Sequence, residues 1–173
     1  MMPRRRILAP TRYPWRFNGP TSSRHIVENR DFVPFNYLSS KIEGVTVFNP
    51  WPPRRFDLVH AFNRIPLGRT PFVIGFESHL PRAFGLEGGT LWRAMTALLT
   101  SDRCRGIVAI SEFARQMFLA QHAHDPAATA ALSSKPTLSV ASRRADLRSA
   151  MLERLRAFER LSRSAPVMAA GLV

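Results

Sequence analysis

The side chains best suited to chemistry are a carboxylate and an imidazole close together in the sequence. Glu77 and His79 follow the apolar run 72–76, with Ser78 between them. A carboxylate at the end of such a run is costly to bury without a partner, and His79 or Arg82 could pair with it. A carboxylate beside an imidazole can transfer protons, so Glu77 and His79 are candidate catalytic residues. A structural ion pair explains the same residues equally well.

Two further apolar runs also end in polar residues. His60 lies within the run 58–61, which Asn63 follows closely, and Ser111 follows the run 106–110. Continuous runs rich in β-branched residues are typical of strands buried on both faces of a parallel sheet. In such sheets ligands bind at the carboxyl ends of the strands. The site expected at this edge of the sheet comprises Asn63, Glu77, Ser78, His79 and Ser111.

Two segments with helical spacing position these strands. Thr90 is placed to cap the first helix, and Ser111 is placed to cap the second. Glu112 lies in the first turn of the second helix, where the helix dipole stabilises a negative charge. The alternation of strands and helices predicts an α/β fold, a Rossmann-like parallel sheet flanked by helices. The residues expected to face inward from the two helices are Leu91, Trp92, Met95, Leu98, Leu99, Phe113, Met117 and Phe118.

The N-terminal part and the core form one predicted domain. Residues 1–43 include a weak strand at 7–9 and an irregular region rich in proline and aromatic residues. The apolar spacing of residues 23–37 fits a short helix or irregular packing and decides neither. Residues 44–124 form the Rossmann-like α/β core, and its first residues, 44–48, predict a strand because β-branched residues crowd them.

The tail, residues 125–173, differs in composition and is rich in alanine and arginine. We expect no sheet strand in its first part, up to residue 142. Residues 146–161 then predict an amphipathic helix with basic residues outside its apolar face. Such a helix could dock on the domain, on an anionic membrane or on a partner.

The chain is strongly basic, with 25 Lys and Arg against 12 Asp and Glu and a net charge of +13. This balance favours anionic partners such as nucleic acid or an anionic membrane surface. A coding bias toward arginine explains the excess equally well. Nucleic acid is the less favoured partner, because the arginines are spread along the chain without the interleaved aromatic residues of a known reader. A basic binding module for nucleic acid or anionic membranes is the first alternative function.

A single cysteine and a histidine pair complete the candidate reactive groups. Cys104 is the only cysteine of the sequence, so an internal disulfide is excluded. No base accompanies it, and we therefore expect a structural thiol. His122 and His124 are expected at the surface, and no metal is predicted because no third ligand stands at metal-site spacing. The N-terminus lacks the apolar segment of a signal peptide, and no stretch is long enough to span a membrane. The protein is therefore expected in the cytoplasm.

Three phrases of the central stretch, in this order, resemble a known family. They are DLVHAFN at residues 57–63, PFVIGFE at 71–77 and CRGIVAISEFAR at 104–115. They are similar to the N-terminal half of a GT-B glycosyltransferase, of the large retaining group that acts in lipopolysaccharide, capsule and glycolipid synthesis. In that group one strand reads roughly D-V-V-H-x-H, the next ends V-x-x-H/E, and a later one ends in V-A-x-S-E-x-x-R.

The resemblance implies half of a GT-B fold, namely a Rossmann-like domain that binds the acceptor. Glu77 matches a strand-end position where the family often has a histidine facing the cleft, and Ser111 and Glu112 match the S-E phrase, whose part is more structural than chemical. A sugar or lipid-linked acceptor would then be the ligand, at the inner face of the membrane. The residues expected to contact it are His60, Asn63, Ser78, Arg82, Ser111 and Glu112, with Glu77 and His79 as the catalytic candidates.

The family's donor domain carries two glutamates separated by seven residues, and no two glutamates of this chain stand at that spacing. The resemblance implies a nucleotide sugar donor for the complete enzyme but no cofactor in this chain. We hypothesise that the gene is truncated or frameshifted near residues 125–140; alternatively, a partner chain supplies the donor domain. A small α/β hydrolase or lyase that uses Glu77 and His79 is the second alternative function.

Overall fold

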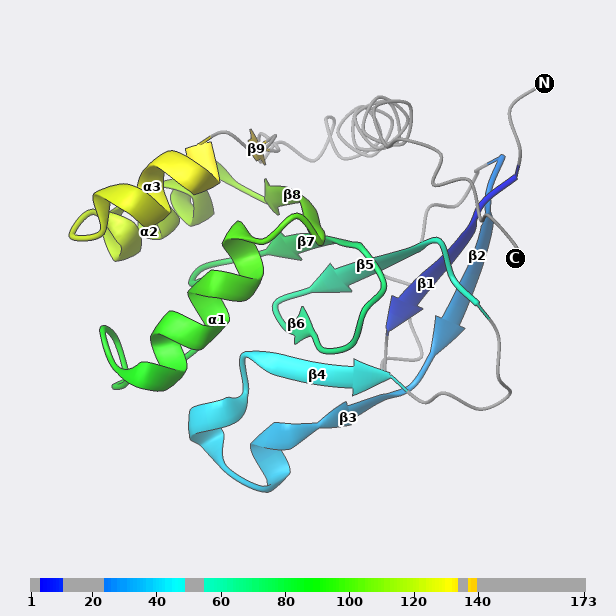
Figure 1. Cartoon of the computed structure of the whole chain (residues 1–173), viewed down its shortest axis with the longest axis horizontal. Coiled ribbons are helices and arrows are strands. Elements are labelled where there is room, and N and C mark those ends of the chain that lie inside the picture. Colours follow the sequence, from blue (N-terminus) through cyan, green and yellow to red (C-terminus); the bar gives the residue numbers. More distant parts are fainter. Residues whose placement is uncertain (1–3, 11–23, 49–54, 134–136, 140–173) are drawn as a thin grey trace, which may run out of the picture.

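The computed structural model describes residues 4–10, 24–48, 55–133 and 137–139. Its centre is a parallel six-stranded sheet with the strand order β2-β1-β5-β7-β8-β9 (Figure 1). The sheet confirms the predicted α/β class, because it is parallel and flanked by helices. Its strands are β1 (Arg6–Pro10), β2 (Ile26–Arg30), β5 (Leu58–Phe62), β7 (Phe72–Phe76), β8 (Cys104–Ala109) and β9 (Thr137–Ser139).

The order of the strands reverses once within this sheet. β2 lies on one side of β1, and every later strand of the sheet lies on the other side, beginning with β5. In open α/β sheets, ligands bind beyond the carboxyl ends of the strands at such a reversal. Asn63 directly follows β5 and is therefore close to this position.

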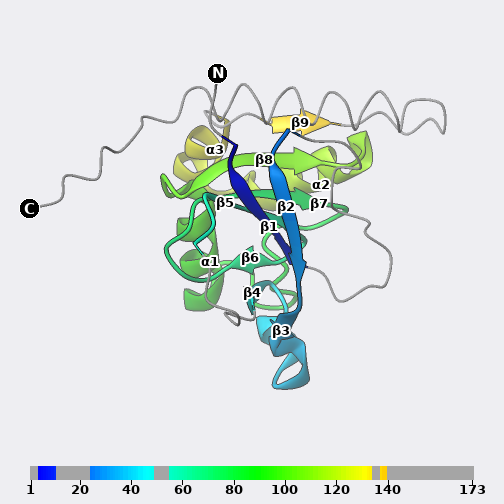
Figure 2. The same cartoon turned by 90° about the vertical axis from the view of Figure 1, so that its right-hand side faces the viewer.

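A smaller sheet lies beside the main one. It contains β3 (Phe32–Pro34), β4 (Val45–Phe48) and β6 (Ile65–Pro66), with β4 antiparallel to β3 and parallel to β6. Two 3-10 turns, η1 (Phe35–Tyr37) and η2 (Ser40–Ile42), connect β3 to β4. Figure 2 shows this connection projecting from the end of the molecule opposite β9. The strand predicted at residues 44–48 is thus confirmed, but it belongs to this second sheet.

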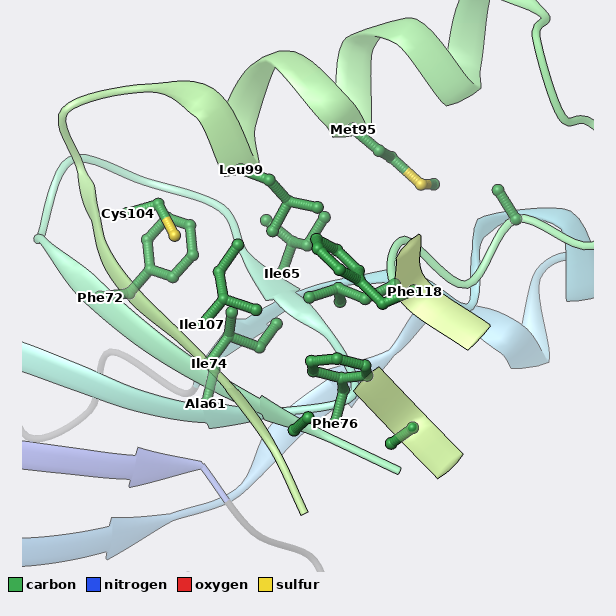
Figure 3. Packing of buried hydrophobic residues seen from close by; sticks show 14 of the residues in the cluster. Ala61, Ile65, Phe72, Ile74, Phe76, Met95, Leu99, Cys104, Ile107 and Phe118 are labelled. Atoms are coloured by element: carbon green, nitrogen blue, oxygen red, sulfur yellow. The ribbon is translucent and has the colours of Figure 1, made fainter. Parts of the chain in front are cut away.

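Three helices share one core with the main sheet. They are α1 (Thr90–Thr100), α2 (Glu112–His122) and α3 (Pro126–Ser133). Alternate strand residues such as Ala61, Ile74 and Ile107 point into this core (Figure 3). Alternation places these residues on one face of the sheet, so the helices cover that face. Each large apolar side chain buried there contributes roughly 1.5–3 kcal/mol to the stability of the fold.

Two expectations about the helices need correction. Gly89 occupies the N-cap of α1 in an extended conformation, and no side chain caps this helix, so Thr90 is its first residue rather than its cap. Phe113 is 64% exposed, although it was expected to face inward. The buried stripe of α2 runs through Ala114, Phe118 and His122, which leaves Phe113 one position off this face.

The region after α2 also differs from expectation. The sequence predicts no sheet strand up to residue 142, yet β9 pairs in parallel with β8. It is a three-residue strand at the edge of the sheet, too short to show a periodic pattern. In the undecided region 23–37 the chain forms β2 and β3. The predicted helix at 146–161 lies outside the described residues. No helix among the described residues is long and apolar enough to span a membrane.

Candidate functional site

The polar residues that follow β5 and β7 meet at one edge of the sheet. Asn63 is only 8% exposed, and its backbone takes a left-handed conformation with φ of 58°. This conformation turns the amide side chain toward β7, where Nδ2 donates to Glu77 Oε1 at 2.9 Å. The backbone N–H of Glu77 donates in return to Asn63 Oδ1 at 3.2 Å. Asparagine is one of the few residues that tolerate this backbone conformation.

Arg82 joins Glu77 to Glu43, which lies in the turn between η2 and β4. Its Nη2 lies 3.8 Å from Glu77 Oε1, and its Nη1 lies 3.2 Å from Glu43 Oε1. Arg64 also reaches Glu43, with Nη2 3.6 Å from Oε1 and Nε donating to the backbone carbonyl at 3.2 Å. Two carboxylates and two guanidinium groups therefore alternate along the edge. We name the set Asn63, Glu77, Arg82, Glu43 and Arg64 the edge cluster.

Sequence reasoning identified three members of the edge cluster and missed Glu43 and Arg64. Arg64 directly follows Asn63, so its position after a strand was an available signal. Glu43 lies in the turn before β4, and nothing in the local sequence connects it with Glu77. Glu77 is the most open of the charged members, with its side chain 47% exposed, whereas that of Arg82 is 20% exposed.

The backbone of the edge cluster is tightly packed beside Gly44. A methyl group added at Gly44 would lie 2.5 Å from the carbonyl oxygen of Arg82. Only a glycine therefore allows the start of β4 to approach the loop after β7 so closely. The same glycine accepts a hydrogen bond from the N–H of Ile65 at 2.7 Å. The hydrogen bond lies within the smaller sheet, and the close approach of Gly44 to Arg82 brings the start of β4 against the loop after β7, where Arg82 meets Glu43.

His79 contacts an aromatic ring in the loop after β7. Its ring contacts Phe84 edge-on, with 5.4 Å between the ring centroids. Among the described residues no hydrogen bond or ion pair joins it to Glu77, whose partners are Asn63 and Arg82. Ser78 is half-buried between the two. His60 is also half-buried, and its position between Val59 and Ala61 directs it to the opposite face of the sheet from the helical core.

Ser111 and Glu112 both stabilise α2. Ser111 Oγ accepts a hydrogen bond from the N–H of Ala114 at 3.1 Å, which confirms the predicted helix cap. Arg115 Nε donates to both carboxylate oxygens of Glu112 at 3.0 Å. These bonds hold the pKa of Glu112 below its ordinary value. Ser111 and Glu112, the matched residues of the S-E phrase, thus each have a local structural role in the first turn of α2.

Of the remaining reactive groups, Cys104 and His122 are buried and His124 is exposed. Cys104 is buried, and its Sγ lies 3.8 Å from the carbonyl of Gly106, as expected for a structural thiol. His122 is only 2% exposed, so the expectation of a surface position is wrong for it, whereas His124 is exposed. His122 is buried because α1 and the loop after β7 cover it, which its own sequence neighbours do not reveal. In the described ranges, no three His, Cys, Asp or Glu side chains form a group that could hold a metal.

The edge cluster places hydrogen-bond acceptors and donors within one small area. Glu77 offers carboxylate oxygens as acceptors, and Arg82 Nε, within the described part of the chain, is buried without a hydrogen-bond partner. A partly exposed carboxylate beside a guanidinium accepts and donates within one small area, as hydroxyl groups require. The sequence matches no protein-family model, no curated protein and no solved structure.

Proposed function

We propose that this chain is the acceptor-binding half of a GT-B glycosyltransferase of the retaining group, and that the edge cluster binds the hydroxyl groups of a sugar acceptor. The observation that carries the proposal is the contact of Asn63 and Arg82 with Glu77 beyond the carboxyl ends of β5 and β7. Sugars present closely spaced hydroxyl groups, and carboxylates and guanidinium groups together bind both their hydrogens and their oxygens. The family resemblance of residues 57–63, 71–77 and 104–115 supports the same function.

The charge balance of the edge cluster favours a neutral acceptor over a nucleotide. Glu43 and Glu77 offset the charges of Arg64 and Arg82. A diphosphate bound at the edge cluster would place its negative charge close to two carboxylates, and this repulsion is unfavourable. Transfer of a sugar also requires stabilisation of the leaving diphosphate. We therefore assign the nucleotide sugar to a second domain, on a longer form of the chain or on a partner chain.

The test is a binding experiment with the full chain. Two-dimensional NMR spectra of ¹⁵N-labelled protein are recorded with a panel of octyl glycosides, and separately with UDP-glucose and GDP-mannose. We expect the glycosides to shift the amide signals of Asn63, Glu77 and Arg82, and the nucleotide sugars to leave them unchanged. Glu77→Gln should weaken glycoside binding, and Glu87→Gln, at an exposed position outside the edge cluster, should not. The proposal fails if no glycoside shifts these signals.

The two alternative functions have less support from the contacts. Several arginines that could attract an anionic surface are paired with carboxylates, as Arg6 and Arg30 are with Glu28. Binding of arbitrary DNA at low salt that weakens as salt increases would favour the basic module instead. A hydrolase or lyase would need Glu77 and His79 to act together, and the edge of the sheet joins Glu77 to Asn63 and Arg82 instead.

A further inference from the structure

The last turn of α2 holds the loop that carries Arg82. Gln121 contacts this loop twice: its Oε1 accepts from the N–H of Leu80 at 2.9 Å, and its Nε2 donates to the carbonyl of Pro81 at 2.9 Å. His122 adds a third bond between its Nε2 and the carbonyl of Leu80, at 2.8 Å. These bonds satisfy three backbone groups immediately before Arg82, so the loop cannot move without breaking them.

The bond from His122 defines the protonation of its ring. A carbonyl oxygen only accepts, so Nε2 must carry the hydrogen, and the neutral ring leaves Nδ1 without one. Nδ1 is buried and has no hydrogen-bond partner among the described residues. The ring is stacked on Trp92, with 5.2 Å between centroids, and packs against Phe118 at 4.7 Å. A second proton would therefore place an N–H in an apolar environment, which is unfavourable.

Few charged groups oppose this effect. α1 presents Trp92 to the ring, α2 presents Phe118, and the loop presents the Leu80 carbonyl, and none of these titrates near neutral pH. Burial is the largest effect and lowers the pKa of His122 below its ordinary value of 6.5. Two smaller effects raise this pKa: the hydrogen bond to the Leu80 carbonyl and, after it, the charge of Asp125. The neutral ring is thus the form that the fold favours.

The opposite side of the loop is fixed by Gly44, which packs against the carbonyl of Arg82. The backbone of residues 80–82 is therefore held between α2 and the start of β4. From this position the Arg82 side chain reaches both Glu77 and Glu43. The two sides differ in chemistry, since Gly44 acts by shape alone and His122 acts through a group that can gain a proton.

We propose that Gln121 and neutral His122 are positioning residues that hold Arg82 opposite Glu77, and that a proton on Nδ1 of His122 releases the loop because the charged ring leaves its apolar site. The inference rests on the proposed function only for the identity of the ligand that Arg82 meets. The hydrogen bonds themselves predict the behaviour of the loop in the absence of any ligand. Acidification should disorder residues 80–82 while the core strands remain folded.

We call the three hydrogen bonds from Gln121 and His122 to residues 80 and 81 the clamp. Amide hydrogen exchange of the full chain tests the clamp directly. The protection factor of the Leu80 N–H, the donor to Gln121, is compared at about pH 7.5 and about pH 5. In the wild type we expect it to fall by about tenfold or more on acidification while that of Ile74 in β7 stays high. His122→Gln retains a donor that does not titrate, so its Leu80 protection should be independent of pH. Gln121→Leu should lose protection at both pH values, and Gln116→Leu, at an exposed position of the same helix, should behave as the wild type.

Two results would overturn the proposal. One is Leu80 protection that is the same at both pH values in the wild type, and the other is Gln121→Leu with unchanged protection. Should His122→Gln fail to fold, the ¹⁵N signals of the His122 ring in the wild type decide the tautomer, and a ring protonated at Nδ1 alone would contradict the clamp.

The octyl glycoside titration separates this proposal from the proposed function. With a working clamp and a sugar site, glycoside affinity falls on acidification in the wild type and stays constant in His122→Gln. Glycosides that never bind, combined with pH-dependent exchange at Leu80, would refute the sugar site and leave the clamp standing. Glycosides that bind without any response of Leu80 to pH would refute the clamp alone.

Discussion

Asn63 and Glu77 are joined by reciprocal hydrogen bonds, in which the Asn63 amide group donates to the carboxylate and accepts from the backbone N–H of Glu77. The two residues follow neighbouring strands, so this contact ties the ends of β5 and β7 together. It also orients the carboxylate toward Arg82. The left-handed backbone of Asn63 makes the arrangement specific to this residue type.

Substitution of Asn63 should separate its backbone role from its side-chain role. Asn63→Ala loses the two side-chain bonds and strains the left-handed backbone, so we expect a loss of about 2–4 kcal/mol in the free energy of unfolding. Asn63→Gly loses the bonds without the strain and should lose roughly 1 kcal/mol less. Urea unfolding curves of the two variants measure this difference. Equal losses would show that the backbone conformation carries no penalty.

Gly44→Ala should disturb the edge cluster through shape alone. Its methyl group would lie 2.5 Å from the Arg82 carbonyl, so either the loop or β4 must shift. Overpacking of this kind costs about 1–3 kcal/mol of stability. Gly89→Ala is the comparison variant: its nearest contact is longer, 3.1 Å from the Leu86 carbonyl, so its loss of stability should be smaller even though it also replaces the N-cap of α1. Thermal unfolding that affects both variants alike would contradict the close approach.

The stability of the protein should depend on the proton of His122. Burial lowers the pKa of His122 in the folded state below the unfolded value of 6.5, so the unfolded state binds a proton first as the pH falls. The contribution is complete above about pH 6.5 and is lost as the pH falls from there toward the folded pKa. Unfolding midpoints measured across this range should decline in the wild type. His122→Gln should show a smaller decline, and an identical pH profile would exclude His122 as the cause.

The two long helices should respond differently to loss of their first hydroxyl groups. Ser111 caps α2 through the N–H of Ala114, so Ser111→Ala should lower the free energy of unfolding by about 1 kcal/mol. Thr90 is the first residue of α1 and makes no cap, so Thr90→Ala should change stability by less than about 0.5 kcal/mol. Urea unfolding of both variants checks the difference. A larger effect at Thr90 would refute the assignment of Gly89 as N-cap.

The three central strands were predictable because their signal is local. Residues 58–61, 72–76 and 106–110 are apolar runs, interrupted only by His60, and such runs are typical of strands buried on both faces of a parallel sheet. Two of the polar residues after these runs, Asn63 and Glu77, meet at one edge because their strands are parallel and adjacent. The cap at Ser111 was predictable for the same reason, as its partner lies within one turn.

Other elements gave too little local signal. β3 and β9 are short, and β2 and β9 lie at the edges of the main sheet, where a strand does not need an uninterrupted apolar run. Phe113 was misplaced because a shift of one residue along α2 moves a side chain by about 100° around the helix. Such errors concern single positions and leave the fold class unaffected.

The sequence alone determined that a carboxylate, Glu77, ends a buried strand and needs a partner. Only the tertiary structure decided which partner it has: Asn63 and Arg82 contact it, and His79 packs on Phe84 instead. It also decided that His122 is buried, since α1 and the loop after β7 cover that ring. The physical reason is that strand and helix patterns depend on neighbours a few residues away. Charge pairing and burial depend on elements that come together only when the two sheets and the helices pack.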